Sequence, residues 1–467
     1  MVWRAMTTTR PPEVDFNPVK RIRREFRAER DLDGDLPPGD LGLSAKRARR
    51  FVDDPLGLLL DSYRRFGPVF TLRMGTTPTV WMIGPEANHF MLVSGTRHFT
   101  WRDGFMGDLI PLVGDGLLTT DGDYHDAARK ALTPAFHRKS IDAATRVMLE
   151  EADAALDTVQ PGADLDAYTW TRRLALGIAM RALFGMEADG ERRELIAERF
   201  ENALSFYYRP VWEVMLRGPG TPWARMQREK SRLDELVMEE IARRRARAGG
   251  GDDIVGILAE GELADDQIRD QVLTLLFAGH DTTTSTISFL LYELARNPVA
   301  LDRLVEEIDR ELHGEPPEPA HLFDGLPQLE MTVADTLRLY PAAWWGPRMV
   351  VEPYEFNGHR VPAGVRVQYS SWVSHRLPEV FPQPEAFLPE RFAPEAKAEL
   401  PKGAYIPFGG GTRMCIGKRF GETEIKAIAI RLLQRFRPEL QAGFRLAVRQ
   451  APTLSPRDGM PLRLLPR

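Results

Sequence analysis

The pattern of apolar and polar positions changes along the chain and predicts helices in the middle and strands near both ends. Apolar residues in Val69–Leu72 and Val80–Ile83 flank the turn residues Gly75–Pro78, which is typical of a β-hairpin. From about Tyr124 to Leu312, apolar residues recur at helical spacing. After Tyr340, short apolar runs between turn signals predict strands at Val350–Phe356, Arg360–Val361, Val365–Tyr369, Phe444–Val448 and Leu462–Leu465. The pattern therefore predicts a mainly α protein with small antiparallel β-sheets.

The longest helical pattern runs from about Ala264 to Arg296 and is unusually apolar. Asp265 and Asp266 suit its first turn, and Asn297-Pro298 ends it. Its middle, Ala278–Thr284, is a poor helix sequence, because a glycine and consecutive short polar or β-branched residues cost helix stability. A costly stretch inside a long apolar helix requires an explanation.

Composition and charge exclude some classes of protein. Of the 467 residues, 43% are apolar and 28% charged, which describes a globular protein that can bury a large core. The net charge of −5 is spread without long runs of one sign, so the chain lacks the basic stripe that nucleic-acid binding needs. The basic cluster Lys20–Arg30 is interrupted by glutamates and is typical of a solvated helix face.

The chain has one cysteine, which cannot form an intramolecular disulfide and suits a reducing compartment. Residues 1–40 contain neither an apolar stretch long enough to cross a bilayer nor the apolar core of a signal peptide. We expect a cytoplasmic protein without a transmembrane anchor. Because no repeat or long linker divides the chain, we expect an N-terminal arm, residues 1–50, and a single catalytic domain, residues 51–467.

The single cysteine, Cys415, lies between a glycine-rich loop and a predicted helix, Ile416–Phe436. At a helix N-terminus, unpaired N–H groups and the helix dipole lower the pKa of a thiol and favour thiolate, a good ligand for iron. An isolated cysteine is more often a buried structural residue. The spacing of its neighbours favours the ligand, because it combines Phe408, Gly411, Arg413, Cys415 and Gly417.

This segment resembles the cysteine-ligand signature of the cytochrome P450 family, F-x-x-G-x-R-x-C-x-G, at every specified position. The resemblance extends from roughly Pro55 to the C-terminus. It implies the cytochrome P450 fold, with heme b (iron protoporphyrin IX) between the long central helix and the cysteine-loop helix. It also implies that Cys415 is the metal ligand, the proximal thiolate of the haem iron.

The poor helical stretch resembles the oxygen-binding motif of the same family. The resemblance implies that Ala278 and Gly279 let the helix pass close over the haem. It makes Thr282 and Asp281 the catalytic pair: the threonine hydroxyl distorts the helical hydrogen bonding, and the acid feeds protons toward dioxygen. Without the cysteine loop, packing would be the commoner explanation of such threonines. His280 is expected to be structural or solvent-facing.

Haem propionates need cationic partners. The resemblance assigns this role to His125, Arg129, Arg348 and Arg413. The first two lie four positions apart and so share a helix face.

Asp335 and Arg338 occupy the positions of the family's E-x-x-R pair, which meets an arginine of a later proline-rich loop, here Arg391. The pair is three positions apart on one helix face. Asp335 is a departure from the family glutamate, and we expect its shorter side chain to affect stability and haem retention more than chemistry.

The resemblance implies a monooxygenase that inserts one atom of dioxygen into a lipophilic molecule, such as a fatty acid or terpenoid, while the other leaves as water. It places the substrate between the haem and three regions: Phe99–Leu118, Phe200–Trp223, and Ala342–Trp345 with Leu454–Met460. These regions contain apolar and aromatic side chains, each with about even odds of being core residues: Phe105, Met106, Leu109, Phe206, Tyr207, Tyr208, Trp212, Trp344 and Trp345.

The chain carries no fused flavin or iron–sulfur module, so electrons are expected from a ferredoxin and its reductase, or from a flavodoxin. Docking is expected near Lys402, Lys418 and Arg419, and the enzyme is expected to be a monomer. Three alternatives stay open: a peroxide-driven peroxygenase, a non-catalytic haem sensor and a haem-free helical binding protein. Asp281 and Thr282 argue against the first, because peroxide already brings its own protons and electrons.

Overall fold

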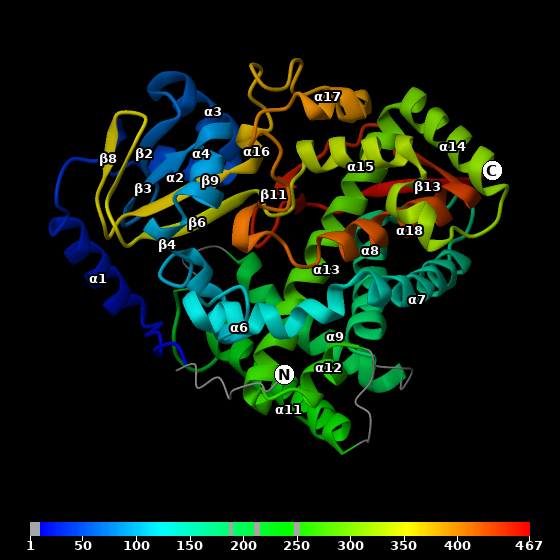
Figure 1. Ribbon diagram of the computed structural model, residues 1–467, viewed down its shortest axis with the longest axis horizontal. Helices are drawn as coiled ribbons and strands as arrows, with labels where there is room; N and C mark the ends of the chain where they lie inside the picture. The colour runs from blue at the N-terminus through cyan, green and yellow to red at the C-terminus, as the bar shows by residue number, and fades with distance from the viewer. Residues whose placement is uncertain (1–9, 186–189, 210–214, 247–252) are drawn as a thin grey trace.

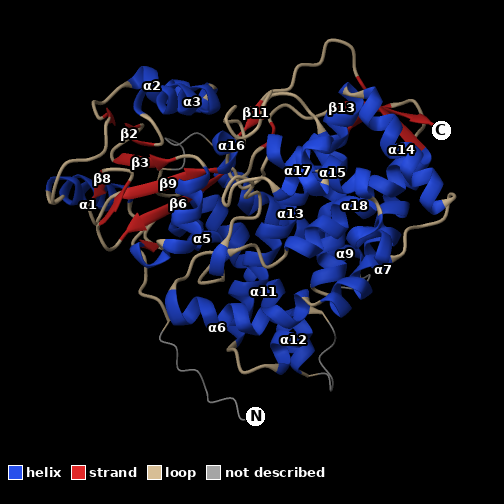
Figure 2. Cartoon of the chain, turned by 45° about the horizontal axis from the view of Figure 1, so that its top comes forward, coloured by secondary structure: helices blue, strands red, loops and turns tan. Residues whose placement is uncertain are grey.

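The computed structural model describes residues 10–185, 190–209, 215–246 and 253–467. Helices form the larger part of the molecule, and most strands gather on one side of it (Figures 1 and 2). The helix α13 runs through the centre of the helical part (Figure 1). The prediction of a mainly α protein with small sheets is therefore confirmed.

The α-helices are α1 Pro18–Arg30, α2 Ala45–Asp53, α3 Pro55–Phe66, α4 Pro85–His89, α5 Ile110–Val113, α6 Gly122–Leu132, α7 Arg138–Asp157, α8 Ala167–Ile178, α9 Gly190–Leu204, α11 Pro222–Arg245, α12 Ile254–Glu260, α13 Asp265–Arg296, α14 Pro298–Leu312, α15 Pro327–Leu339, α16 Ser371–Ser374, α17 Pro394–Ala398 and α18 Lys418–Arg435. Short 3₁₀ or π segments that matter below are η1 Phe90–Ser94, η3 Phe105–Leu109 and η6 Ser205–Tyr208.

The main sheet has six strands in the order β1-β2-β3-β9-β6-β4. They are β1 Gly39–Asp40, β2 Val69–Arg73, β3 Pro78–Met82, β9 Arg366–Ser370, β6 Trp345–Val350 and β4 Phe99–Thr100. The predicted hairpin is the antiparallel pair β2–β3, with Val69 opposite Met82. The sheet is mixed rather than antiparallel, because β1 runs parallel to β2 and β3 parallel to β9.

Three smaller sheets complete the fold. A three-stranded sheet joins β10 Phe436–Leu440, β13 Pro461–Pro466 and β5 Asp164–Asp166, and the two-stranded pairs are β7 Tyr354–Phe356 with β8 His359–Val361 and β11 Val448–Arg449 with β12 Ser455–Pro456. The predicted strand Phe444–Val448 is wrong, because only its last residue is in a strand. The main pairing in this region uses Phe436–Leu440 instead, which the sequence pattern assigned partly to the preceding helix.

The helix α13 has 32 residues and is continuous through the poor helical stretch. Hydroxyl groups there donate to carbonyl oxygens one turn earlier, Thr282 to Ala278 at 2.6 Å and Thr284 to His280 at 2.8 Å. These bonds satisfy side chains that would otherwise be buried and unpaired. The helix is therefore continuous through these threonines, and the predicted distortion at Thr282 stays a prediction. Among the described residues, no helix is long and apolar enough to cross a membrane.

The predicted arm is attached to the rest of the structure by its last strand. β1 pairs with β2, with Gly39 opposite Thr71 and Asp40 opposite Leu72. A Cβ atom on Gly39 would lie 1.9 Å from the Thr71 carbonyl oxygen, so only glycine allows this approach. The division into an arm and a catalytic domain stays a prediction.

A buried ion network joins α15 to the segment that leads toward the cysteine loop. Arg338 Nε donates to Asp335 Oδ1 at 2.5 Å, and neither side chain is exposed. The other carboxylate oxygen, Oδ2, accepts the Leu388 N–H at 2.6 Å. Arg391 Nε lies 3.9 Å from Oδ1, beyond hydrogen-bond range. The aspartate thus pairs directly with Arg338, and the contact that its shorter side chain weakens is the one with Arg391.

Replacing Asp335 by alanine is expected to destabilise the protein strongly. The substitution leaves the Arg338 guanidinium buried without a counter-charge, which costs about 3–5 kcal/mol in the free energy of unfolding. Urea unfolding measures this change. Glu390→Ala is the matched control, because its partner Arg303 and Glu390 itself are both about half exposed, and such a pair contributes about 0–1 kcal/mol. Equal losses in the two variants would contradict the analysis.

Candidate functional site

The cysteine loop is held by backbone hydrogen bonds and ends in the turn before α18. The Cys415 N–H donates to the Phe408 carbonyl at 3.0 Å, and the Gly417 N–H donates to the Cys415 sulfur. The helix begins at Lys418, three residues after the cysteine, with Gly417 as its N-cap. The loop therefore fixes the direction of the sulfur before the helix begins.

One glycine of this loop, Gly411, is required by its backbone conformation and its close neighbour. It has φ +62°, and a Cβ atom there would lie 2.0 Å from the Leu92 carbonyl oxygen of η1. Only glycine combines this conformation with this close approach. Gly411 therefore lets the cysteine loop pack against η1.

The surroundings of Cys415 raise the pKa of its thiol, contrary to the expectation from the helix N-terminus. The residue is exposed, and desolvation of its sulfur by nearby protein atoms is the largest effect on the pKa. Desolvation disfavours the charged thiolate. The Gly417 N–H and the Arg129 guanidinium oppose this effect but do not cancel it. The protein groups alone therefore favour the neutral thiol.

His375 connects the cysteine loop to the buried ion network. Its Nε2 accepts the Ile406 N–H at 2.9 Å, and its Nδ1 lies 3.3 Å from the Arg338 carbonyl oxygen. Because Nε2 is an acceptor, the proton must be on Nδ1 and the ring must be neutral. Burial, together with repulsion from Arg338, lowers the pKa of His375 to about 3. The sequence places this histidine near the loop but does not indicate its contacts.

The helix α13 leaves one narrow strip of its surface accessible. From Asp270 to Leu294, the residues that are not buried are Ala278, Gly279 and Thr282. Their spacing puts them on one face of the helix. On the neighbouring side, the Thr283 hydroxyl lies 3.4 Å from Glu424 of α18, the helix that follows the cysteine loop. The accessible strip is therefore next to the place where α13 contacts α18. These are the two helices between which the sequence predicts the haem.

Asp281 is buried beside this strip, and both of its carboxylate oxygens accept hydrogen bonds. The Tyr208 hydroxyl of η6 lies 3.2 Å from Oδ1, and the Thr453 hydroxyl donates to Oδ2. Arg172 in turn donates to the Tyr208 oxygen at 3.1 Å. Adjacent helical residues point about 100° apart, so Asp281 faces this polar cluster while Thr282 faces the accessible strip. The predicted pair is adjacent in sequence but lies in two environments.

His280, the neighbour of Asp281, is structural. It is fully buried, and its Nε2 lies 3.2 Å from the Arg172 carbonyl oxygen. Burial lowers the pKa of His280 to about 4, so the ring is neutral. The alternative that it faces solvent is wrong.

The four predicted propionate partners lie in one cluster of positive charge. Arg413 donates to Asp121 at 2.7 Å, and His125 lies 2.9 Å from Asp126. The pKa of His125 is lowered first by burial and then by the charges of Arg413 and Arg129. The two guanidinium groups of Arg348 and Arg413 contact the same aromatic ring, that of Trp101, at 3.3 and 5.1 Å from its centre. The structure thus brings together all four residues.

Arg348 is the least compensated of these cations. It is buried, and within 4 Å it has no carboxylate partner among the described residues. Its nearest acceptor is the carbonyl oxygen of the preceding Pro347, at 2.7 Å. Burial, the largest effect, lowers the pKa of Arg348 to about 10. A buried guanidinium without a counter-charge is unfavourable, and an anion beside it would remove this cost.

Comparison with known proteins identifies the family. The family model described as Cytochrome P450 matches residues 46–450. The chain belongs to the cytochrome P450 family. It is 31% identical to cyclooctat-9-en-7-ol 5-monooxygenase of Streptomyces melanosporofaciens over 81% of this chain and 84% of that protein. It is also 31% identical to cyclooctatin synthase of the same organism, over 92% of this chain and 95% of that protein.

A solved structure, that of retinoic acid-bound cyanobacterial CYP120A1, has the same fold. The TM-score is 0.82 at 28% identity, over 94% of this chain and all of that chain. The predicted family and fold are therefore confirmed. The protein is an oxidoreductase of the monooxygenase type, and membership of the family implies a haem cofactor.

The residues of this cytochrome P450 fit a haem group. The cations include a buried guanidinium without a carboxylate, which suits a propionate. The one accessible strip of α13 consists of small residues and a threonine, which suits the face of a flat ring. Sequence reasoning missed Trp101, Asp121 and Thr453, since their roles come from contacts between distant segments and no local pattern marks them.

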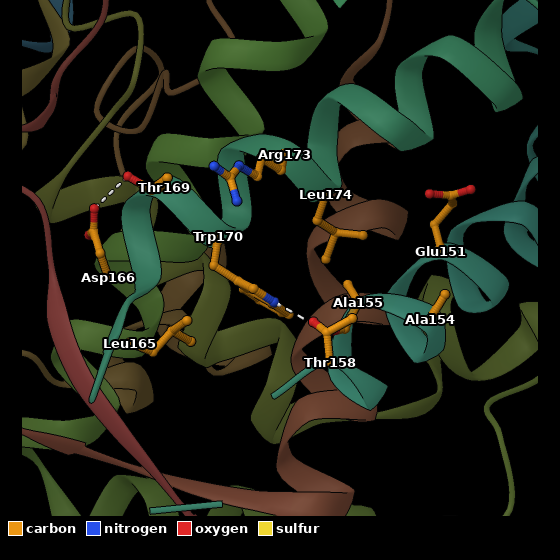
Figure 3. A pocket seen from close by; sticks show the side chains of 10 residues that line it. All are labelled: Glu151, Ala154, Ala155, Thr158, Leu165, Asp166, Thr169, Trp170, Arg173 and Leu174. Carbon is orange, nitrogen blue, oxygen red and sulfur yellow. Dashed lines mark hydrogen bonds between the residues drawn. The ribbon is translucent and has the colours of Figure 1, made fainter. Parts of the chain in front are cut away.

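A pocket of about 440 Å³ lies elsewhere in the cytochrome P450, between α7 and α8 (Figure 3). Trp170 forms one of its walls and donates to the Ala155 carbonyl at 3.4 Å. Its lining includes neither the cysteine loop nor α13. This pocket is therefore separate from the predicted haem site.

The stability of this cytochrome P450 is expected to fall as the pH drops below 6.5. The unfolded chain binds protons at His280 and His375 near the usual pKa of 6.5, whereas the folded protein excludes them until about pH 4 and 3. Each histidine therefore lowers the free energy of unfolding by up to about 1.4 kcal/mol per pH unit in this window. Urea unfolding at pH 6.5, 5.5 and 5.0 measures the slope. His375→Gln keeps a donor and an acceptor but cannot titrate, and a slope equal to that of the wild type would contradict the assignment.

Proposed function

We propose that this cytochrome P450 is a haem-thiolate monooxygenase that binds heme b and inserts one atom of dioxygen into a lipophilic small molecule. The observation that carries the proposal is the accessible strip of α13, Ala278, Gly279 and Thr282, because between Asp270 and Leu294 the helix is accessible only at these residues. The nearby helix α18 follows the only cysteine of the chain. The strip is evidence for a flat cofactor between α13 and the cysteine loop that precedes α18.

Cys415 is the residue that would hold the haem iron, and the bound haem would supply the chemistry of dioxygen activation. The hydrogen bond from Gly417 and the backbone bond to Phe408 orient the sulfur toward one side of the loop. A bound iron cation favours the thiolate, which offsets the desolvation that raises the pKa of the thiol. His125, Arg129, Arg348 and Arg413 would hold the propionates, and Arg348 would gain the counter-charge that it lacks.

Asp281 and Thr282 are the proposed proton-delivery pair. The Thr282 hydroxyl donates to the Ala278 carbonyl at 2.6 Å. Its oxygen can still accept a hydrogen bond from a group that lies over the accessible strip. Asp281 accepts from Tyr208 and Thr453, on the other side of the helix. To deliver a proton toward Thr282, the carboxylate must exchange at least one of these hydroxyl partners. Tyr208 and Thr453 therefore position the acid.

The proposed substrate is an apolar molecule of the terpenoid or fatty-acid class. An aromatic contact joins the first and third predicted pocket regions, because the Phe105 ring lies 5.4 Å from that of Trp345, and within the second region Phe206 lies 5.8 Å from Trp223. Trp344, by contrast, is a buried core residue that stacks on neighbouring tryptophans. Trp212 lies outside the described residues. One similar protein is named for an alcohol of the cyclooctatin series and another was solved with retinoic acid, which favours a terpenoid.

Electrons are proposed to come from a separate ferredoxin and reductase, or from a flavodoxin. Lys402 is exposed on the side of the cysteine loop, and Lys418 and Arg419 each lie 3.9 Å from Glu422, too far for a short ion pair. Their positive charge thus stays available to an acidic carrier. The cytoplasmic location and the monomeric state stay predictions.

The spectrum of the reduced carbon monoxide complex tests the proposal. Wild-type protein is expected to show the long-wavelength Soret band of thiolate ligation, and Cys415→Ala is expected to lose it completely, since the chain has no other cysteine. Thr412→Ala, an exposed position of the same loop, is the control and keeps the band. A wild-type band in Cys415→Ala would reject Cys415 as the ligand.

Thr282→Ala tests proton delivery. Substrate binding is expected to persist, while product formed per reducing equivalent falls by about tenfold or more, since positioned proton transfer typically contributes about 10²–10⁴-fold to a rate and bulk water can replace part of it. The missing electrons are expected as hydrogen peroxide. Tyr208→Phe removes only one partner of Asp281, and we expect a smaller loss of coupling from it. Thr286→Ala, whose hydroxyl bonds the Thr282 carbonyl at 3.0 Å on a buried face, is the control. Unchanged coupling in Thr282→Ala would refute its role.

A further inference from the structure

The N-terminal segment Arg10–Arg21 crosses the outside of two predicted pocket regions that lie far apart in the sequence. At one end it contacts the loop 114–121 and the start of α13, and at the other it contacts η3. Between these ends, it contacts the start of α11. The sequence placed this segment in an arm and gave it no role in the site.

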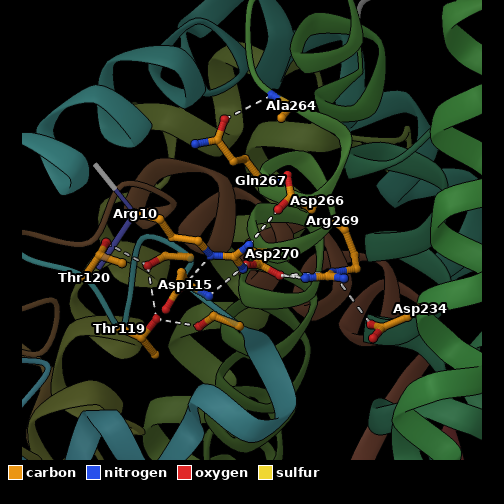
Figure 4. A network of polar contacts seen from close by, with 12 residues as sticks. Arg10, Asp115, Thr119, Thr120, Asp234, Ala264, Asp266, Gln267, Arg269 and Asp270 are labelled. Atoms are coloured by element: carbon orange, nitrogen blue, oxygen red, sulfur yellow. Dashed lines mark hydrogen bonds and ion pairs between the residues drawn. The ribbon is translucent and has the colours of Figure 1, made fainter. Parts of the chain in front are cut away.

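Arg10 joins three carboxylates of two different elements (Figure 4). Its guanidinium donates to Asp115 at 2.8 Å, to Asp266 at 2.6 Å and to Asp270 at 3.1 Å. Asp270 of α13 is fully buried and also accepts from Arg269 at 2.6 Å. Three carboxylates this close repel one another unless cations lie between them. Arg10 therefore holds Asp115 and its loop against α13.

The loop held in this way leads directly to the predicted haem site. The Asp115 N–H donates to Asp270 at 2.9 Å, and the Leu117 N–H donates to Gln271 at 2.9 Å. At the end of the loop, the Thr120 carbonyl accepts from Arg413 at 2.7 Å. The loop is also tight, because a Cβ atom on Gly116 would lie 1.8 Å from the Thr274 hydroxyl oxygen. A shift of this loop would move the first pocket region as a unit.

Arg21 makes the second attachment, at η3. Its guanidinium binds both oxygens of Asp108, at 2.5 and 3.0 Å. The carbonyl oxygen of Asp108 accepts from the Tyr207 hydroxyl of η6 at 3.0 Å. Asp108 is therefore a meeting point of the arm, the first pocket region and the second.

Apolar and backbone contacts complete the crossing. The Phe16 ring lies 6.3 Å from that of Trp223, and its carbonyl oxygen accepts from Arg217 at 3.0 Å. The Pro12 carbonyl accepts from Arg102 of the first region at 2.8 Å. Segment Arg10–Arg21 thus contacts both pocket regions along its length.

We propose that residues 10–21 are a clasp over the substrate site, in which Arg10 and Arg21 are positioning residues that hold the first and second pocket regions together. Substrate passes between these regions when the clasp opens. This inference rests on the proposed function, because it takes these regions as the walls of the substrate site. The side chains of Arg10 and Arg21 are 48% and 27% exposed, so solvent reaches both guanidinium groups and salt screens their ion pairs.

Arg10→Ala, Arg21→Ala and the double variant test the clasp in the haem-loaded protein. The control is Arg27→Ala, an exposed arginine of α1 for which no ion pair with a described residue is found. The probes are 4-phenylimidazole, an apolar azole that ligates haem iron, and carbon monoxide, which is small enough to pass narrow openings. Stopped-flow absorbance gives the association and dissociation rates at 50 mM and 500 mM sodium chloride.

Both 4-phenylimidazole rates are expected to rise about two- to fivefold in each single variant and further in the double variant, as expected for the loss of partly exposed ion pairs. Carbon monoxide rates are expected to change little. High salt is expected to accelerate the wild type toward the variants and to change the double variant less. Arg27→Ala is expected to match the wild type. Asp108→Asn, which removes only a charge, is expected to reproduce Arg21→Ala.

The outcomes separate the clasp from the proposed function. A normal thiolate band with azole rates that match the wild type in every variant overturns the clasp and leaves the function standing. A lowered unfolding midpoint with unchanged rates shows a structural role only and also overturns it. Equal acceleration in Arg27→Ala overturns it as well, since the effect would then not depend on the ion pairs. Absence of a thiolate band in the wild type rejects the proposed function instead.

Discussion

The structure depends on one constraint, which is that α13 must be buried on nearly every side and still stay open along one strip. Its hydroxyl residues keep hydrogen-bond partners in this arrangement, because Thr282, Thr284 and Ser288 each donate to a carbonyl one turn earlier. Buried hydroxyls without partners would cost about 1–3 kcal/mol each. The polar motif can therefore lie in the core without interrupting the helix, and Ala278 and Gly279 provide the open surface. Catalytic chemistry in this region needs both properties together.

Charge organises the opposite side of the site. The structure gathers His125, Arg129, Arg348 and Arg413 in one cluster, in which Arg348 and Arg413 share the Trp101 ring and carboxylates accompany only part of the set. Protein interiors avoid positive charges that outnumber their carboxylate partners, because desolvation makes each unpaired ion unfavourable. The cluster is consistent with a site built for an anionic ligand, and burial of Arg348 is its clearest sign. By the same physical argument, desolvation raises the pKa of the Cys415 thiol, and a cation bound to the sulfur would reverse that preference.

The sequence predicts the fold well and offers candidate members of the site, because both are recorded in local patterns. The hairpin, α13 and the cysteine loop follow from periodicity and spacing, and the four cations follow from the family resemblance. What the sequence does not contain is the set of partners. Asp281 binds Tyr208 and Thr453, each far from it along the chain, and only the fold brings them together. The expected lowering of the Cys415 pKa failed for a related reason, since it considered the helix terminus and not the desolvation by distant segments.

Two adjacent tyrosines connect the rim of the pocket to the acid of α13. Tyr207 bonds the Asp108 carbonyl in the first pocket region, and Tyr208 bonds Asp281 beside the oxygen-binding motif. Both residues belong to the short 3₁₀ segment η6, so the segment cannot move without changing both contacts. Asp108 is also the residue that Arg21 holds. Displacement of Asp108 and exchange of a hydroxyl partner of Asp281 are therefore mechanically linked through η6.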